Sequence, residues 1–213
     1  MTHLERTYLD EALRSLRADL LDPEGPRIST TRKYNFAILP YRPSDERKLR
    51  ERVKRLTHEL KAEGWSVLSI ALHRLLLDRL RTLEPGHLES VVAREKRLHA
   101  RDPQRALTHL TEFLARHIEG PDGLAADVAR LIAEFKESLP SPTSPAVAFV
   151  GRAGALYPFF RTSALLRHID GHTGDVPVVF LYPGESRGST ALSFMGELEP
   201  DRDYRPRIYA GAS

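Results

Sequence analysis

Short apolar runs alternate with amphipathic stretches along this chain, and this alternation is the feature that most narrows the choice of fold. Residues 34–39 form one apolar run, a helical stretch follows at about 45–63, and a second apolar run spans 65–72. Ser44 is expected to cap that helix and Gly64 to end it. Strands that are apolar on both faces are typical of parallel sheets covered by helices. Strand, helix and strand at this spacing predict a parallel βαβ unit and an α/β protein.

Helical periodicity also covers the start and the long middle of the chain. Residues 4–20 carry leucines at helical spacing, and residues 73–139 follow the same pattern with three breaks. The breaks are expected at Pro85-Gly86, Asp102-Pro103 and residues 120–123. The middle of the chain is therefore interpreted as a set of helices joined by short turns.

Strand-like runs return after the helical stretch, and no internal repeat is present. Strands are expected at 146–150, 176–182, 192–194 and 204–209, with a helix at 157–169. We predict one α/β domain over residues 1–213, with a Rossmann-like, mostly parallel sheet flanked by helices. Its strands would come from about 34–72 and 146–209, with a helical insertion at about 73–139.

Composition excludes several classes of protein. The chain has no cysteine, which removes disulfide scaffolds, thiolate metal sites and cysteine nucleophiles. Lys plus Arg is 32 against 29 for Asp plus Glu, and a formal net charge of +3 does not by itself indicate nucleic-acid binding. No run approaches the roughly 18 apolar residues of a membrane span, and the first twenty residues are too charged for a signal peptide. We expect a cytoplasmic protein without membrane contact.

A glycine turn follows the strand at 146–150. Gly151-Arg152-Ala153-Gly154 stands before a helix, where nucleotide-binding α/β proteins hold a phosphate on backbone N–H groups. The lysine of a P-loop is missing, because the last lysine of the chain is Lys136, and the dinucleotide motif needs a third glycine. Two interpretations stay open: a phosphate or nucleotide site, and a tight turn with no ligand.

The stretch Gly184-Glu-Ser186-Arg-Gly188 matches the G-x-S-x-G pattern of a hydrolase nucleophile elbow. Hydrolases of that fold place the catalytic histidine after the serine, but the last histidine here is His172. Pro183-Gly184 indicates a turn, and the residues after Gly188 are a poor start for the elbow helix. We therefore expect no nucleophilic serine and no enzymatic activity.

Metal sites are not expected either. His168, Asp170 and His172 offer suitable ligands, but Gly171 interrupts the helix that would align them. The other histidines are scattered, and no HExxH motif is present. We expect neither a metal ion nor an organic cofactor.

The stretch 42–61 concentrates basic side chains, with eight of them against four acidic ones. Because the apolar positions of this helix face the core, Arg47, Arg50, Lys54 and Arg55 are expected on its outer face, where they can contact a DNA backbone. No aromatic residue is interleaved to stack on bases. The alternative is an ordinary solvated face with local ion pairs.

The last seventy residues resemble a known family. The segment from Gly151 to Arg161, followed by Leu165-Leu166, is similar to the GxGxxYPFxR…LL segment of BrxB, a core component of BREX bacteriophage-exclusion systems. The run from Val178 to Gly184, with the later Gly188, Phe194 and Gly196, is similar to the FYPGxxxG…LFG stretch of that family. Asp203-Tyr204-Arg205 is similar to its closing YYR, and residues 34–39 fit its first βα unit.

The resemblance implies a small, non-catalytic subunit of a phage-defence assembly that supports host DNA methylation and phage restriction. The resemblance implies three partners. PglZ, an alkaline-phosphatase-like protein, is the expected docking partner, and the other two are the adenine methyltransferase PglX and the ATPase BrxC. Candidate partner- or phosphate-binding residues lie at the turns after the strands: Gly151, Arg152, Gly154, Tyr157, Arg161, Tyr182, Gly184, Gly188, Tyr204 and Arg205.

Two alternatives stay open. The glycines can simply shape turns while the tyrosines belong to the core. The chain can also be a nucleotide- or DNA-binding accessory subunit that uses the Gly151–Gly154 turn or the basic 42–61 helix.

Overall fold

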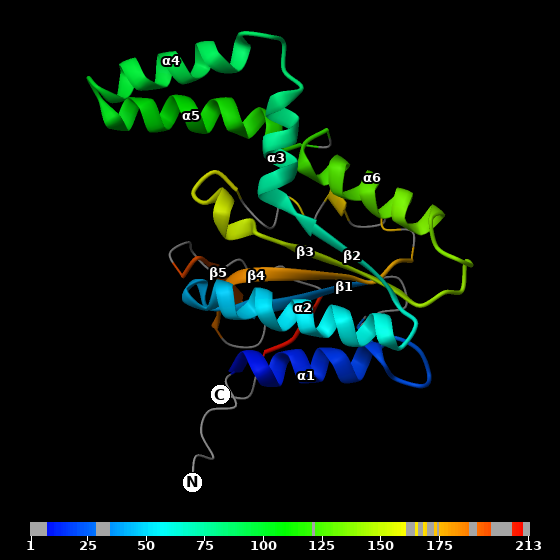
Figure 1. Ribbon diagram of the computed structural model, residues 1–213. Coiled ribbons are helices and arrows are strands. Elements are labelled where there is room, and N and C mark those ends of the chain that lie inside the picture. The colour runs from blue at the N-terminus through cyan, green and yellow to red at the C-terminus, as the bar shows by residue number, and fades with distance from the viewer. Residues whose placement is uncertain are drawn as a thin grey trace.

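A mostly parallel β-sheet lies at the centre of the computed structural model (Figure 1). The structure describes residues 8–28, 35–120, 122–160, 165, 168–169, 173, 175–187, 191–196 and 206–210. The strands in this part of the chain are β1 (Phe36–Tyr41), β2 (Ser66–Ala71), β3 (Ala146–Gly151), β4 (Val178–Arg187), β5 (Ala191–Phe194) and β6 (Arg207–Ile208). Their order is β2-β3-β4-β1-β6, all parallel, and β5 pairs antiparallel with β4. The predicted α/β fold with a mostly parallel sheet flanked by helices is therefore confirmed.

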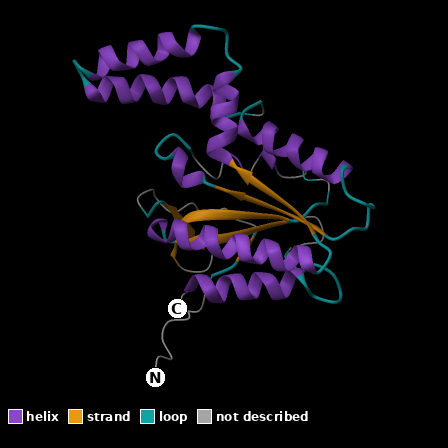
Figure 2. Ribbon diagram, viewed as in Figure 1, coloured by secondary structure: helices purple, strands orange, loops and turns teal. Residues whose placement is uncertain are grey.

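Alternate residues of each central strand pack on opposite faces of the sheet, because successive side chains of a strand point in opposite directions. Ala37 and Leu39 of β1 face α1 (Tyr8–Leu20) and α2 (Glu46–Ala62). Phe36 and Ile38 belong to the core on the other face, with α3 (Leu72–Arg81) and α6 (Leu124–Glu137). Figure 2 shows the resulting three layers, with helices on both sides of the strands. This double covering explains why the strands are apolar throughout.

The first two strands form the predicted parallel βαβ unit, but they are not neighbours in the sheet. β1 and β2 run in the same direction in one sheet, but β3 and β4 lie between them. Helix α2 therefore crosses over two strands that the chain adds later, β3 beginning at Ala146 and β4 at Val178. Local spacing predicts the direction of the two strands and gives no information on later insertions into the sheet.

Helix α2 buries one stripe, Leu49, Val53, Leu56 and Leu60, and ends as predicted at Gly64, whose φ is +83°. The predicted N-cap is wrong. Ser44 lies inside a short 3-10 helix, Pro43–Asp45, and Asp45 precedes α2 without a side-chain cap. The fixed φ of Pro43 suits the first position of such a turn.

The helical insertion contains α3, α4 (His87–His99), α5 (Pro103–Ile118) and α6, with the breaks where the sequence predicts them. The Asp102 carboxylate accepts a hydrogen bond from the backbone N–H of Arg105 at 3.1 Å, and Pro103 takes the first helical position. Helices α4 and α5 form an antiparallel hairpin that projects from the rest of the molecule (Figure 1). No described helix is long and apolar enough to cross a membrane.

Three predicted boundaries are wrong. β1 continues through Pro40 to Tyr41, on a stretch where only β4 pairs with it among the described strands, so the missing N–H of Pro40 costs little. Residues 157–159 form a turn and not the start of the predicted helix. β4 does not end at Tyr182 but continues to Arg187, because β5 pairs with its second half.

Candidate functional site

The carboxyl ends of β1, β3 and β4 meet at one edge of the sheet, which is where open α/β sheets bind ligands. Tyr41 closes β1, Gly151 closes β3, and Tyr182 lies at the same level on β4. The glycine turn and the YPG segment lie next to each other here, since Pro183 Cβ would lie 3.4 Å from a Cβ placed on Gly154. This edge is the first candidate site.

A small polar network spans this edge. Glu46, in the first turn of α2, accepts a hydrogen bond from the Tyr41 hydroxyl and lies 2.8 Å from the Arg152 guanidinium. Arg50 lies one turn further along α2, 3.9 Å from the same carboxylate. Burial, followed by the hydrogen bond to Glu46, raises the pKa of Tyr41 far above its usual range. Because both carboxylate oxygens are already engaged, the network links β1, β3 and α2 and does not provide a free acid or base.

His73 lies at the carboxyl end of β2, close to this network. Its Nδ1 atom is buried and has no hydrogen-bond partner among the described residues. Burial, with the nearby charges of Arg152 and Arg74, lowers the pKa of this imidazole. The ring is therefore held neutral and brings an unused polar atom to the edge.

The glycine turn is shaped by packing. A Cβ on Gly151 would lie 3.1 Å from Leu181 Cδ1, and one on Gly154 would lie 3.2 Å from the sulfur of Met195. Arg152 adopts a left-handed conformation with φ of +67°, and the chain then enters a four-residue 3-10 helix, Ala153–Leu156. A helix this short does not supply the aligned N–H groups and dipole that hold a phosphate. Nucleotide binding at this turn stays a prediction without support from this geometry.

The two tyrosines of the predicted surface meet inside the molecule. The rings of Tyr157 and Tyr182 lie 6.4 Å and 5.6 Å from that of Phe194, with Phe160 against the same ring at 6.1 Å. Tyr182 is 1% exposed and its hydroxyl donates to the carbonyl of Leu192 at 3.3 Å. The expectation that Tyr182 offers contact area to a partner is therefore wrong, because β5 covers it. Tyr157 is half-buried.

The G-x-S-x-G stretch is a strand up to Arg187. Gly184 is buried and pairs with Phe194, and Ser186 pairs with Leu192, within the β4–β5 hairpin. A nucleophile elbow is a sharp turn from a strand into a helix, and this backbone is different. The predicted turn over 182–188 is thus wrong for its described part. Of the candidate residues, Arg161, Gly188, Tyr204 and Arg205 lie outside the described residues.

The basic face of α2 is exposed as predicted. Arg47, Arg50, Lys54 and Arg55 all point to solvent, and His58 and Lys61 continue the same side of the helix. Other charges of the stretch are used in docking α1: Arg52 lies 3.0 Å from Asp10, and Glu59 lies 2.9 Å from Arg17. The candidate DNA-contacting residues are therefore available, while part of the predicted basic excess holds two helices together.

The α4–α5 hairpin forms a surface that no motif in the sequence indicates. None of the α4 residues is buried, and α5 buries only Ala106, Leu114 and Ile118. Three large apolar side chains of the described residues are exposed: Val92 at 45% and Leu107 at 40% on this hairpin, and Leu77 at 46% on α3. Apolar residues at helical spacing predict the two helices of the hairpin. This spacing does not distinguish a helix that packs on the core from one that projects into solvent.

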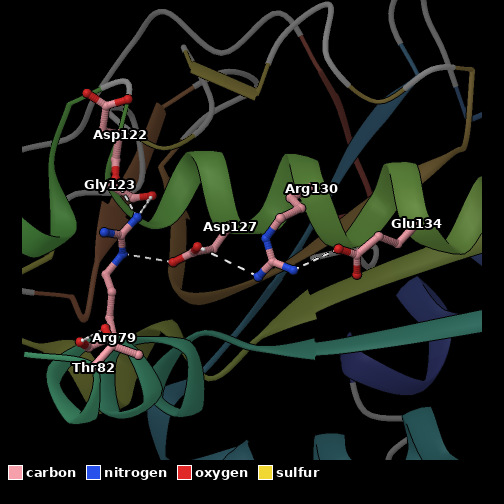
Figure 3. A network of polar contacts seen from close by, with 7 residues as sticks. All are labelled: Arg79, Thr82, Asp122, Gly123, Asp127, Arg130 and Glu134. Atoms are coloured by element: carbon pink, nitrogen blue, oxygen red, sulfur yellow. Dashed lines mark hydrogen bonds and ion pairs between the residues drawn. The ribbon is translucent and has the colours of Figure 1, made fainter.

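Arg79 fixes the base of this hairpin (Figure 3). From α3 its side chain reaches the loop before α6, where it donates to the carbonyls of Asp122 and Gly123 and lies 2.8 Å from the Asp127 carboxylate. Both side chains of that ion pair are about three-quarters buried. Arg130 extends the network from Asp127 to Glu134, which it contacts at 2.8 Å. This joint ties α3 to α6 and to the loop that connects α5 with α6.

Metal binding has no visible site in the described part of the chain, where no three His, Asp or Glu side chains come together. His109 is engaged by Glu95 across the hairpin, and His117 stacks edge-on against Phe113 at 5.0 Å. Asp170 and His172 lie outside the described residues.

Comparison with known proteins identifies one family. The family model described as BREX protein BrxB matches residues 68–208, which include the helical insertion and the strands from β3 to β6. No curated protein and no solved structure matches the chain. The match covers about two-thirds of the chain, including the glycine turn and the YPG segment.

Proposed function

The chain belongs to the BrxB family and is thus a component of a BREX phage-defence system, and from this premise we propose that it is a non-catalytic docking subunit. It would act in the cytoplasm and hold PglZ, the partner expected from the family resemblance, with PglX and BrxC as further partners of the same assembly. In that role it supports host DNA methylation and phage restriction without carrying out either reaction itself.

The observation that carries this proposal is the α4–α5 hairpin. Two helices of 13 and 16 residues extend from the molecule while α4 contributes no buried residue to either core. Helix α4 and the start of α5 do little for folding, since Val92 and Leu107 stay in water while the core contacts of α5 lie at its base, in Leu114 and Ile118. An exposed apolar surface on a rigid projection is a usual form of protein–protein binding site.

Co-purification tests the proposal. The full-length chain is co-expressed with PglZ, PglX and BrxC, and each pair is isolated through a tag on this chain. We expect PglZ to co-purify in a fixed ratio, and absence of all three partners under conditions in which each is folded would refute docking. A Ser186→Ala variant is expected to keep phage restriction and host methylation at the unsubstituted level, and loss of either would contradict the non-catalytic role.

A second candidate function is DNA binding through α2. It is supported by the exposed row of Arg47, Arg50, Lys54 and Arg55, in which the one ion pair to another described residue is the 3.9 Å contact of Arg50 with Glu46. Backbone contacts of this kind release counterions, so the affinity for duplex DNA would fall steeply with salt, with a slope of about 0.9 per phosphate contact. Replacing Lys54 and Arg55 by alanine would reduce that slope by about two, and an unchanged slope would exclude α2 as the contact.

A further inference from the structure

A groove lies near the tip of the α4–α5 hairpin. Its volume is about 570 Å³, and it is lined by Glu95, Lys96 and His99 of α4 and by Pro103, Ala106, Leu107 and Leu110 of α5. Ala106 is buried, whereas the other lining side chains are half-buried or exposed. A cleft between two antiparallel helices has the shape that accepts a third helix.

The apolar lining of this groove continues a stripe that is buried elsewhere. Leu107, Leu110, Leu114 and Ile118 share one side of α5 by their spacing. Leu114 and Ile118, at the base of the hairpin, belong to the core under α3 and α6, whereas Leu107 at the tip is 40% exposed. Val92 is spaced four and seven residues from Lys96 and His99, and so extends the same side of α4. The apolar side of the hairpin is therefore left uncovered where it leaves the body.

The charge around this groove is strongly basic. Residues 94–105 carry five cationic side chains, Arg94, Lys96, Arg97, Arg101 and Arg105, against the two carboxylates of Glu95 and Asp102. Both carboxylates are occupied within the hairpin: Glu95 binds His109, and Asp102 caps α5. None of the five cations forms an ion pair with another described residue. The tip thus presents unneutralised positive charge beside an apolar groove.

A second copy of this chain is a poor occupant. The base of the same side is already packed on the body through Leu114 and Ile118, so two hairpins can overlap only tip to tip. That arrangement places five cations opposite five cations, and like charges at an interface oppose association. An acidic partner would instead be attracted to the positive charge of the tip.

We propose that the tip groove binds an acidic amphipathic helix of another BREX protein. Its apolar side would cover Leu107, Leu110 and Val92, and its carboxylates would face Lys96 and Arg101. The inference deepens the proposed docking function and rests on it. It assigns the docking surface and the chemistry of the segment that fits there.

Site-directed photocrosslinking tests the assignment. The photoreactive residue p-benzoylphenylalanine replaces Leu107 in the full-length chain, which is co-expressed with the other proteins of its BREX system and purified as the assembly. The control places the same residue at Thr108, which is exposed on the neighbouring side of α5. We expect a crosslink from position 107, and none from 108, to a partner peptide rich in Asp or Glu that is helical in its own protein.

Every other result overturns the assignment. A crosslink from position 107 to a second copy of this chain, to a basic or neutral peptide, or to nucleic acid assigns a different occupant. An intact assembly without a crosslink from 107 refutes the groove and leaves the docking function standing. Absence of co-purifying partners refutes the docking function itself, so the two failures are distinguishable.

Charge reversal provides an independent measurement. Lys96→Glu combined with Arg101→Glu is expected to weaken association with the partner by tenfold or more, and to make the remaining binding less sensitive to salt. Arg14→Glu on α1 combined with Arg74→Glu on α3 changes the net charge equally, at exposed positions outside the α4–α5 hairpin. An equal loss of binding in both double variants would indicate a non-specific charge effect and overturn the proposal.

Discussion

The guanidinium Nη1 of Arg152 lies 2.8 Å from Oε1 of Glu46, which ties the residue after β3 to the first turn of α2 across 106 positions of the sequence. Both side chains are largely buried, at 31% and 25% exposure, and Glu46 also holds the Tyr41 hydroxyl. The edge that binds ligands in many α/β proteins is thus held together by an ion pair within the chain. An arginine expected to meet a partner or a phosphate is used here to hold the fold together.

Removing this arginine is expected to destabilise the protein in a graded way. Arg152→Ala loses the ion pair with Glu46, a charged hydrogen bond in a partly buried position, at a cost of about 1–2 kcal/mol. Arg152→Gly loses the same pair but also removes the Cβ that Arg152 holds at φ of +67°, which recovers about 1 kcal/mol of backbone strain. Urea denaturation measures both variants. Equal stability of the alanine and glycine variants would contradict the role given to the backbone.

The joint between α3 and α6 leads to a second prediction. Arg79→Ala removes an ion pair with Asp127 and leaves the carbonyls of Asp122 and Gly123 without their donor, which costs about 2–3 kcal/mol. Arg81 is two residues away and pairs with Asp78 at 2.7 Å, but its side chain is 70% exposed. Arg81→Ala should therefore change the free energy of unfolding by less than about 0.5 kcal/mol.

Thermal denaturation of the two variants provides the comparison. Hydrogen exchange adds a local readout, since loosening of the joint should increase exchange in α5 and α6 before it affects the central strands. A loss of stability at Arg81 comparable to that at Arg79 would mean that the joint is not specific.

Much of this fold is predictable from local patterns. The buried strands follow from continuous apolar runs, the apolar stripe of α2 follows from a period of 3.6 residues, and the breaks between the later helices follow from glycine and proline. The order of the strands cannot be predicted in this way, because it depends on pairs such as Val178 with Phe36, which lie far apart in the sequence. The prediction that β4 ends at Tyr182 fails for a related reason. Pro183 and Gly184 favour a turn by themselves, and tertiary pairing makes them a strand, Pro183 with Tyr41 of β1 and Gly184 with Phe194 of β5.

The candidate site residues are likewise predictable only in part. The exposed basic row on α2 is predictable, because helical spacing shows which side is apolar and leaves Lys54 and Arg55 outside. The burial of Tyr182 depends on β5, which covers it from a later part of the chain. The groove near Leu107 depends on where the body ends beneath α5, a property of tertiary packing that helical periodicity does not contain.

The pKa values of two buried tyrosines predict a loss of stability at alkaline pH. Burial and a hydrogen bond to a carboxylate raise the pKa of both Tyr41 and Tyr209 above the usual value of 10.0. In the unfolded chain both phenols ionise near pH 10, whereas in the folded protein they stay protonated. The stabilising contribution is therefore complete below pH 10 and is lost as the pH rises above it, by about 1.4 kcal/mol per pH unit for each tyrosine.

Phenylalanine variants isolate this contribution. Tyr41→Phe and Tyr209→Phe should each be less stable than the unsubstituted chain at pH 8, through loss of one hydrogen bond, and the deficit should shrink between pH 10 and pH 11. Guanidinium denaturation at a series of pH values measures the change. A constant deficit over this range would mean that neither hydroxyl is held protonated by the fold.

The close approach of β4 and β5 leads to the last prediction, which compares two glycines. A Cβ on Gly184 would lie 2.1 Å from the carbonyl oxygen of Ser193 and 2.6 Å from Cε1 of Tyr182, both fixed within the β4–β5 hairpin and its aromatic cluster. Gly184→Ala therefore forces the two strands apart and is expected to cost more than about 3 kcal/mol, measured by thermal denaturation. At Gly154 the nearest atom is the Met195 sulfur at 3.2 Å, at the flexible end of a side chain. Gly154→Ala should cost less than about 1 kcal/mol, since methionine repacks easily, and a larger loss there would mean that the glycine turn is constrained by more than packing.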